Sequence, residues 1–190
     1  WSLADTQSLN SFGQIQTLIK VENRIFARVW GIGLFELIND AFEFVENSEL
    51  YADNRVESIV LTASKELAIF SSTKGAHLLN ASGNFVPIKN VKLNNWLKEN
   101  KIYNVSELKK LSDGKIPLIS FEGGGLLLNE NLEIIDKIDL SDGLLSNTIT
   151  SIHRDLNDDL YLTSLLSASR IKMNNAVTTY DESYGIKGLV

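Results

Sequence analysis

Residues 145–155 (LSNTITSIHRD) and 160–163 (LYLT) carry the pattern that decides the fold. Apolar and polar residues alternate in both stretches, which predicts two β-strands, and 157–159 (NDD) supplies a polar turn between them. Residues 169–173 (SRIKM) predict a third strand that opens on a small residue, and 177–180 (VTTY) predict a fourth, outer strand. The sequence therefore predicts a four-stranded antiparallel sheet.

Three earlier segments repeat this unit. The small residue that opens the third strand recurs at Gly33, Gly75, Gly125 and Ser169, with spacings of 42, 50 and 44 residues. A period of about 40–50 residues made of short strands is typical of propeller blades. We therefore predict an all-β fold, a β-propeller segment of about four four-stranded antiparallel blades. The first three strands of the earlier copies are expected at 14–19, 24–29 and 33–37; at 52–60, 67–71 and 75–79; and at 102–108, 115–121 and 125–128. The outer strands are expected at 41–45, 85–88 and 134–138.

The repeat also suggests where the blades begin and end. The blades are assigned to 12–48, 49–91, 92–140 and 141–182. Residues 1–11 are a lead-in or the end of a preceding blade, and 183–190 are the start of a fifth. The third copy is longer because of residues 92–100, which we interpret as a loop insertion with room for one helical turn.

An arc of four blades leaves two apolar blade faces uncovered, and faces of that size are rarely left in water. We therefore expect the sequence to be a fragment of a larger, seven-bladed propeller, with further blades or a second copy covering the open faces.

Composition excludes several classes of protein. The 190 residues carry a net charge of −6, which disfavours nucleic-acid binding, and they include no cysteine, which excludes disulfide scaffolds and thiolate metal sites. No apolar run approaches the roughly 18–20 residues that cross a bilayer, so we expect no membrane insertion in this segment.

The fourth copy resembles one family of repeats. Residues 142–152 (DGLLSNTITSI) are similar to the repeat of the two-component regulator propeller family, which has an Asp-Gly-Leu lead, a Ser-Asn turn, a strand ending in Asp and a Leu-Trp-Leu-Gly-Thr strand. Residues 30–35 (WGIGLF) are similar to the family's Trp-Gly-x-Gly-Leu. The chain departs from the pattern at Tyr161, which replaces the Trp, and at Asp158 or Asp159, which replace the turn Gly.

This resemblance implies a location and a role. Such propellers form periplasmic or extracellular sensor regions of bacterial hybrid histidine kinases and related signalling proteins. They stand ahead of a triple-tyrosine module, a membrane span and a kinase, cyclase or DNA-binding output domain, which this sequence does not include.

Ser151, His153 and Asp155 have the residue types of a catalytic triad. On a strand they share one face but lie about 6.5–7 Å apart at each step, whereas triad partners need hydrogen-bond reach. We expect them to be polar residues along one face of a blade strand.

Asp155, Asn157 and Asp159 resemble the start of a calcium loop. Leu160 stands where that loop requires Gly and Leu166 where it requires Glu, so a turn between strands explains them better. Residues 123–125 (GGG) follow a strand, but a further strand rather than a helix comes next, so they too predict a turn.

The remaining candidates are single residues. His77 and His153 each lack a second histidine nearby in sequence, and Asn80 and Asn104 match the glycosylation pattern, which also arises by chance. Three tryptophans could stack on a sugar ring; the alternatives are blade packing for Trp30 and an anchored loop for Trp96. The third tryptophan is Trp1.

From these observations we predict no catalytic, cofactor-binding or metal-binding residue, and the sequence does not name the ligand-binding residues. The chain is expected to be an extracytoplasmic propeller segment that senses a small molecule, an oligosaccharide or an envelope protein. The alternatives are a structural scaffold in a cell-envelope assembly and a carbohydrate-active propeller enzyme. A glycosidase would need paired carboxylates, and Glu122 is the one acidic residue of its turn.

Overall fold

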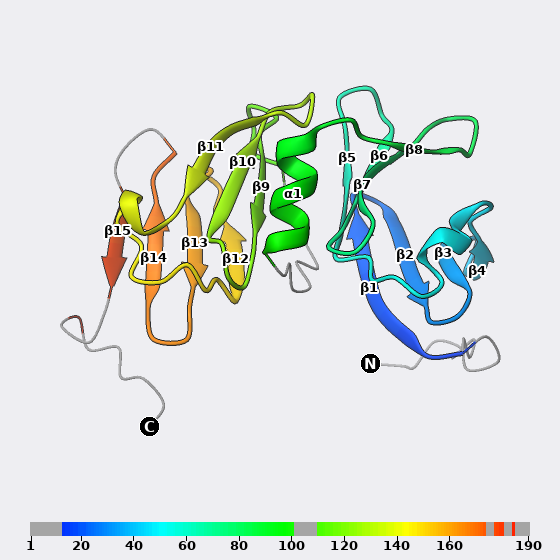
Figure 1. Ribbon diagram of the computed structural model, residues 1–190, viewed down its shortest axis with the longest axis horizontal. Helices are drawn as coiled ribbons and strands as arrows, with labels where there is room; N and C mark the ends of the chain where they lie inside the picture. Colours follow the sequence, from blue (N-terminus) through cyan, green and yellow to red (C-terminus); the bar gives the residue numbers. More distant parts are fainter. Residues whose placement is uncertain (1–12, 101–109, 174–176, 181–183, 185–190) are drawn as a thin grey trace.

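The computed structural model of this chain describes residues 13–100, 110–173, 177–180 and 184. They form four antiparallel sheets that follow one another in chain order, with one α-helix between the second and third (Figure 1). Within the described residues, no helix is long and apolar enough to cross a membrane.

Each sheet is a meander whose neighbouring strands are consecutive in sequence. The first holds β1 (Ile15–Val21), β2 (Arg24–Val29), β3 (Gly33–Ile38) and β4 (Ala41–Phe44). The second holds β5 (Ser58–Leu61), β6 (Leu67–Ser71), β7 (Gly75–Leu79) and β8 (Phe85–Pro87). The third holds β9 (Ile116–Ile119), β10 (Gly125–Leu128) and β11 (Ile134–Ile138). The fourth holds β12 (Ser151–Arg154), β13 (Leu160–Thr163), β14 (Ala168–Ile171) and β15 (Val177–Tyr180).

The predicted all-β fold is confirmed, because turns and alternation together specify these strands. In β13 the buried Leu160 and Leu162 alternate with the exposed Tyr161 and Thr163, as a half-buried strand requires. The third sheet has three described strands, and the strand predicted at 102–108 lies outside the described residues.

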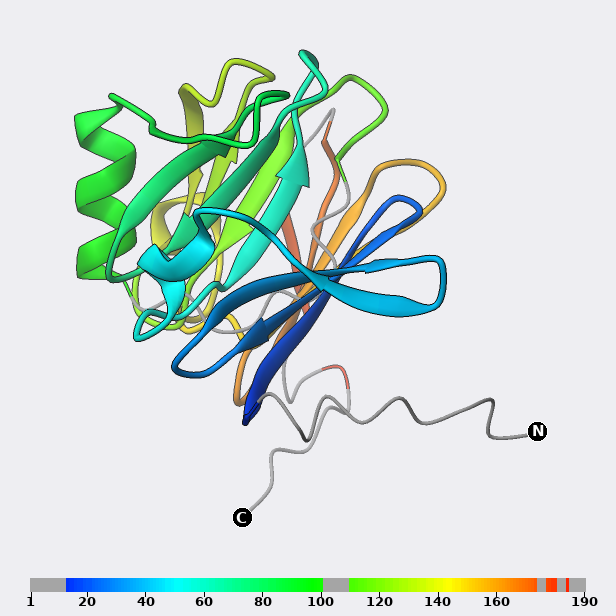
Figure 2. The same ribbon diagram turned by 90° about the vertical axis from the view of Figure 1, so that its right-hand side faces the viewer.

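The stretch interpreted as a loop insertion is instead mostly helical. Helix α1 (Val91–Glu99) has nine residues, and its N-cap Asn90 accepts a hydrogen bond from the Leu93 N–H. Residues 91–99, which follow β8 in the chain, therefore form a helix rather than a loop. Figure 2 shows α1 at the side of the molecule, outside the sheets.

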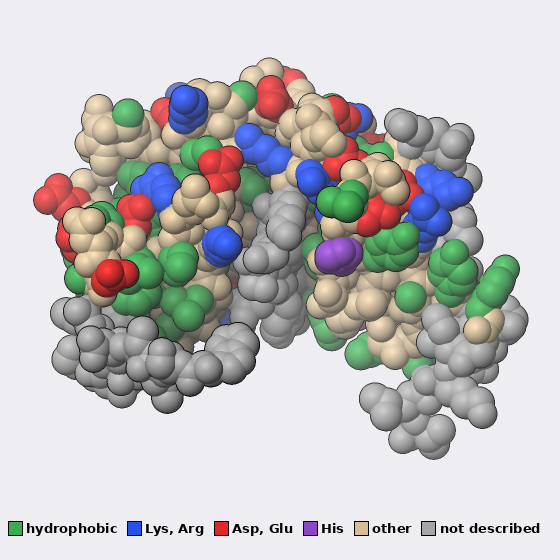
Figure 3. Space-filling view, turned by 180° about the vertical axis from the view of Figure 1, so that it is seen from behind, with side chains coloured by type: hydrophobic (Ala, Val, Ile, Leu, Met, Phe, Trp, Pro, Cys, Tyr) green, Lys and Arg blue, Asp and Glu red, His purple; other side chains and the backbone are tan. Residues whose placement is uncertain are grey.

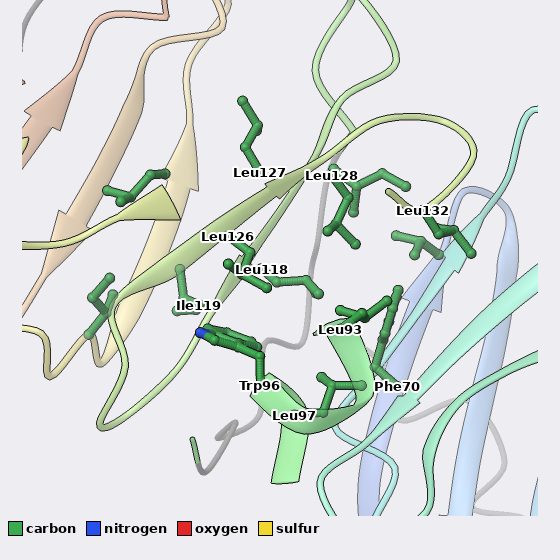
Figure 4. Close-up of a cluster of buried hydrophobic side chains, with 14 of the residues drawn as sticks. Phe70, Leu93, Trp96, Leu97, Leu118, Ile119, Leu126, Leu127, Leu128 and Leu132 are labelled. Carbon is green, nitrogen blue, oxygen red and sulfur yellow. The ribbon is translucent and has the colours of Figure 1, made fainter. Parts of the chain in front are cut away.

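The helix is held by its apolar face. Leu93, Trp96 and Leu97 are buried and belong to one hydrophobic cluster with residues of the second, third and fourth sheets. In Figure 4 the helix places Leu93 and Leu97 beside Phe70 of β6 and Trp96 near Ile119 of β9. Helix α1 thus packs against both the second and the third sheet.

A second cluster joins the first two sheets. Ile19 and Phe26 of the first sheet pack with Ile59, Leu67 and Ile69 of the second. Neighbouring sheets therefore pack face to face through apolar side chains, as propeller blades do.

Candidate binding face

One end of the molecule gathers two kinds of connection. Because the strands alternate in direction, the turns that precede β3, β7, β10 and β14 lie at the same end as the chain that leads from the first sheet to the second and from the third sheet to the fourth. These turns comprise residues 30–32, 72–74, 120–124 and 164–167, and the connections include 45–57 and 139–150. We call this end the turn face; it points downward in Figure 1.

Trp30 is the most prominent side chain of the first turn. Its indole is 50% exposed, and the guanidinium carbon of Arg28 lies 4.3 Å from a ring centroid. The backbone is fixed, because the N–H of Trp30 donates to the carbonyl of Gln14 (2.8 Å). The turn therefore presents a supported aromatic surface to solvent.

Arg28, beneath the indole, is only 1% exposed. Its Nε donates to the carbonyl of Tyr51 (3.0 Å) and its Nη2 to that of Ala52 (2.5 Å), both at the end of the short 3-10 helix Ser48–Tyr51 that leads to the second sheet. Burial lowers the pKa of Arg28, although a guanidinium keeps its charge in proteins.

A buried carboxyl lies in the same connection. Glu57 accepts the N–H of Ser72 at Oε2 (3.1 Å) and its hydroxyl at Oε1 (2.6 Å). Burial raises the pKa of Glu57, and these hydrogen bonds oppose the shift. The pair ties the sheet connection to the 72–74 turn, so two segments of the turn face are fixed to each other.

Exposed leucines extend the apolar part of the turn face. Leu165 and Leu166 lie in the last turn and Leu145 in the last connection, and all three side chains are mostly in solvent. The hydroxyls of Ser164 and Ser167 bond to each other at the base of that turn (2.7 Å). Trp30 is thus not the only apolar group that a partner could contact here.

The opposite end holds a pocket of about 570 Å³ between the third and fourth sheets. Its carboxylates already have partners: Asp113 pairs with Lys115 (2.5 Å), Asp158 accepts from Ser112, and Asp159 pairs with Arg170 (2.5 Å). Its lining also includes Leu111, Asn157, Lys172 and Met173. A ligand would have to displace these contacts, so the pocket is the weaker candidate.

Ser151, His153 and Asp155 do not form a triad. Among the described residues, no hydrogen bond joins any two of them, and Asp155 Oδ1 instead accepts the N–H groups of Asn157 (2.8 Å) and Asp159 (2.9 Å). The residues that resemble a calcium loop therefore close a turn. In the part of the chain that the structure describes, no group of three or more His, Cys, Asp or Glu side chains could hold a metal ion.

The glycine-rich stretch is likewise a turn. The Gly123 N–H donates to Ser120 Oγ (2.8 Å) and the Gly124 N–H to the carbonyl of Asn147 (2.8 Å), so these donors are not available to a phosphate. Asn80 Oδ1 accepts two backbone N–H groups of its own turn. Asn104 and Trp1 lie outside the described residues.

Of the described tryptophans, Trp96 is buried on α1 and Trp30 is half exposed. The sequence patterns did not single out Arg28. Its position in the strand could have indicated that it is buried, because Phe26 and Arg28 share the face of β2 that packs on the second sheet.

Comparison with known proteins concerns the fold. No protein-family model matches the sequence, and no curated protein matches it. Solved structures do match. The extracellular domain of the putative one component system BT4673 from B. thetaiotaomicron superposes with a TM-score of 0.61 at 13% identity, over 90% of this chain and 25% of that one. The fold is that of a β-propeller.

Two further solved structures are similar. PorZ, a surface component of the type-IX secretion system of Porphyromonas gingivalis, gives a TM-score of 0.59 at 15% identity, over 89% of this chain and 23% of PorZ. Streptogramin B lyase gives 0.52 at 12% identity, over 88% of this chain and 54% of the lyase. The chain thus spans about a quarter of BT4673 and of PorZ, and identities this low establish the propeller fold alone.

Proposed function

We propose that this chain is a ligand- or partner-sensing segment of an extracytoplasmic β-propeller in a bacterial signal-transduction protein. The turn face is the surface that binds. Ligands of propellers commonly meet the loops at one end of the blades, where several blades each contribute a side chain.

The single observation that carries this proposal is the half-exposed Trp30 held over the buried Arg28. An exposed indole loses water readily when an apolar or ring-shaped surface covers it, and aromatic and arginine side chains are enriched at binding surfaces. The similarity to the extracellular domain of BT4673 supports the same assignment at the level of fold.

Binding without catalysis is part of the proposal. The hydroxyl, imidazole and carboxyl of Ser151, His153 and Asp155 are not hydrogen-bonded to one another, as nucleophilic catalysis would require. The lyase among the similar propellers shows that the fold itself is compatible with enzymes. For that reason the proposal rests on the residues of this chain.

The alternative is a structural scaffold in a cell-envelope assembly. It is favoured by the likeness to PorZ, a surface component of a secretion system, and by the exposed leucines of the turn face. A scaffold would bury these leucines permanently against an envelope protein, whereas a sensor would bind reversibly.

The test is a thermal-shift screen of the chain against oligosaccharides and small metabolites, followed by hydrogen–deuterium exchange with each compound that binds. We expect slower exchange at 30–32 and 45–57 and unchanged exchange at 155–159, at the opposite end. Protection confined to 155–159 would overturn the assignment of the turn face. No binding compound, together with stable co-purification of an envelope protein, would favour the scaffold.

A further inference from the structure

Arg28 differs from the other arginines whose contacts are known. Arg24, on the same strand, pairs with Glu36 (2.6 Å), Arg154 pairs with Asp158 (3.2 Å) and Arg170 with Asp159 (2.5 Å). Arg28 is the most buried of these and makes no ion pair among the described residues. A buried charge without an opposite charge beside it costs free energy, and a counter-ion bound to the Arg28 guanidinium would offset that cost.

The donors that remain on Arg28 point to the kind of counter-ion. Nε–H and one N–H of Nη2 are used by the carbonyls of Tyr51 and Ala52, whereas Nη1 has no hydrogen-bond partner. A guanidinium has five N–H donors, and the end-on pair from Nη1 and Nη2 matches the two oxygens of a carboxylate. The N–H donors that Nη1 and Nη2 still have free therefore match a planar carboxylate.

Neighbouring carboxylates do not fill this position. Glu57 and Asp53 are near enough for their fields to favour the charge on Arg28, but neither bonds to it, and both oxygens of Glu57 are taken by Ser72. Arg55 adds a second positive charge nearby. The described residues thus leave the outer edge of the guanidinium without an anion.

We infer that Arg28 and Trp30 form an anion site on the turn face, in which the guanidinium binds a carboxylate of a small ligand after the indole swings aside. The inference rests on the proposed function and names the chemistry of its ligand. The guanidinium carbon of Arg28 lies 4.3 Å from a ring centroid of the indole, and Trp30 is itself half exposed. Rotation about the side-chain bonds of Trp30 would move the ring away from the guanidinium without breaking the backbone hydrogen bond of Trp30 to Gln14.

The experiment compares acids with neutral analogues of the same size. Succinate is titrated against succinamide, and glucuronate against glucose, by calorimetry at low salt on the unaltered chain. We expect each acid to bind about tenfold or more tightly than its analogue, since charge-assisted bidentate hydrogen bonds are about twice as strong as neutral ones. Equal binding of acid and analogue would overturn the site, and this comparison needs no variant.

Variants then locate the binding. Arg28→Lys keeps the charge but loses the fork, so acid affinity should fall about tenfold or more. The matched control is Arg24→Lys on the same strand, whose guanidinium is already paired with Glu36, and it should leave the affinity unchanged. Circular dichroism and thermal unfolding confirm that both variants fold. An affinity that falls equally in both, or in neither, would overturn the site.

Trp30→Ala tests whether the indole blocks access to the guanidinium, separately from the surface that the indole offers to ring-shaped ligands. Succinate has no ring to stack on the indole, so the variant should bind it at least as tightly as the unaltered chain. Lost succinate binding would overturn the role of the indole as a cover over Arg28. A neutral compound that protects the turn face and binds Arg28→Lys normally would uphold the proposed function and overturn the anion site. Absence of any protection together with no preference for acids would overturn both.

Discussion

Glu57 links the stability of the turn face to pH. Burial raises its pKa above the ordinary 4.5, so the folded chain holds this proton more tightly than the unfolded chain. Stability from this group is therefore greatest below pH 4.5, declines as pH rises from 4.5 toward the folded pKa, and is level above that value.

The test of this linkage is Glu57→Gln, which keeps an acceptor and a donor for Ser72 but cannot ionise. We expect the variant to gain stability relative to the wild type as pH rises above 4.5, measured by urea unfolding at a series of pH values. Glu66→Gln is the control, because Glu66 also accepts a serine hydroxyl (3.0 Å) but in an exposed turn. A constant difference between Glu57→Gln and wild type across the series would contradict the prediction.

Position 124 requires a glycine for two reasons, the backbone conformation and the close approach of a neighbouring backbone atom. Its φ is +70°, and a Cβ there would lie 2.3 Å from the carbonyl oxygen of Ile138, a backbone atom that cannot turn away. Gly124→Ala should destabilise the chain by more than the roughly 1–3 kcal/mol of a left-handed non-glycine residue. Gly83→Ala is the matched control, since its φ is +77° with nothing within 4 Å. Equal losses of thermal stability in the two variants would show that the nearby carbonyl oxygen of Ile138 adds nothing to the cost of the substitution.

The candidate site could be predicted only in part at this scale. Trp30 was visible as an aromatic residue in a Gly-containing turn, but its exposure depends on how that turn meets the sheet connection. Arg28 was not visible as a site residue, because its two carbonyl partners come from Tyr51 and Ala52, more than twenty residues away. Contacts between residues this far apart in the sequence depend on tertiary packing, and the alternation of apolar and polar residues carries no information about that packing.

At the scale of elements, α1 is fixed to the second sheet by one side chain. Asn94 Oδ1 accepts the N–H of Ala76 in β7 (2.8 Å), and its Nδ2 donates to the carbonyl of Ile88 just after β8 (2.8 Å). The amide thereby satisfies backbone groups at the edge of the sheet, beyond the end of the short β8.

Asn94→Ala should therefore cost about 1–3 kcal/mol of unfolding free energy, because it leaves a part-buried donor and acceptor unpaired. Asn95→Ala is the control: Asn95 is its exposed neighbour on α1, so the change in helix propensity is the same in both variants. The measurement is urea unfolding of both proteins. Equal stabilities would show that Asn94 does not anchor the helix.

Strands were predicted more reliably than the helix, and the reason is physical. Strands β2 and β3 lie where the patterns at 24–29 and 33–37 placed them, since a period of two repeats within a few residues. In 92–100 the apolar residues Leu93, Trp96 and Leu97 have helical spacing, but polar Lys and Asn residues dominate the stretch. The interpretation as a loop gave too little weight to that spacing.

At the scale of the whole molecule, the two terminal sheets present different outer faces. Across the first sheet, one row of paired residues reads Leu18, Ala27, Phe35 and Phe44. Its cluster of Ala27, Val29 and Phe35 is buried, and among the described residues it includes no residue of another sheet. Figure 3 shows hydrophobic side chains at both ends of the molecule, on the part at its left that holds β1–β4 and on the part at its right that holds the fourth sheet.

The corresponding row of the fourth sheet is polar. It reads His153, Tyr161 and Arg170, on the face opposite the buried Leu160 and Leu162. Two such faces are poorly matched to each other, so closure of a ring by packing blade four of one copy on blade one of another is disfavoured. We propose that a further propeller blade covers the apolar face of the first sheet.

The apolar outer face should make the isolated chain self-associate. Leu18 is 53% exposed at one end of that row and Phe44 is 37% exposed at the other, and exposed apolar side chains promote association in water. Leu18→Lys places a charge there. In sedimentation velocity we expect the variant to associate less than the unaltered chain as the concentration rises, while the free energy of unfolding changes by no more than about 0.5 kcal/mol, as for other surface substitutions.

Tyr161→Lys is the control. It introduces the same charge on the polar outer face of the fourth sheet and should leave association unchanged. If both variants reduced association equally, net charge rather than the apolar face would be responsible. If the unaltered chain stayed monomeric at every concentration, the first sheet would need no covering blade.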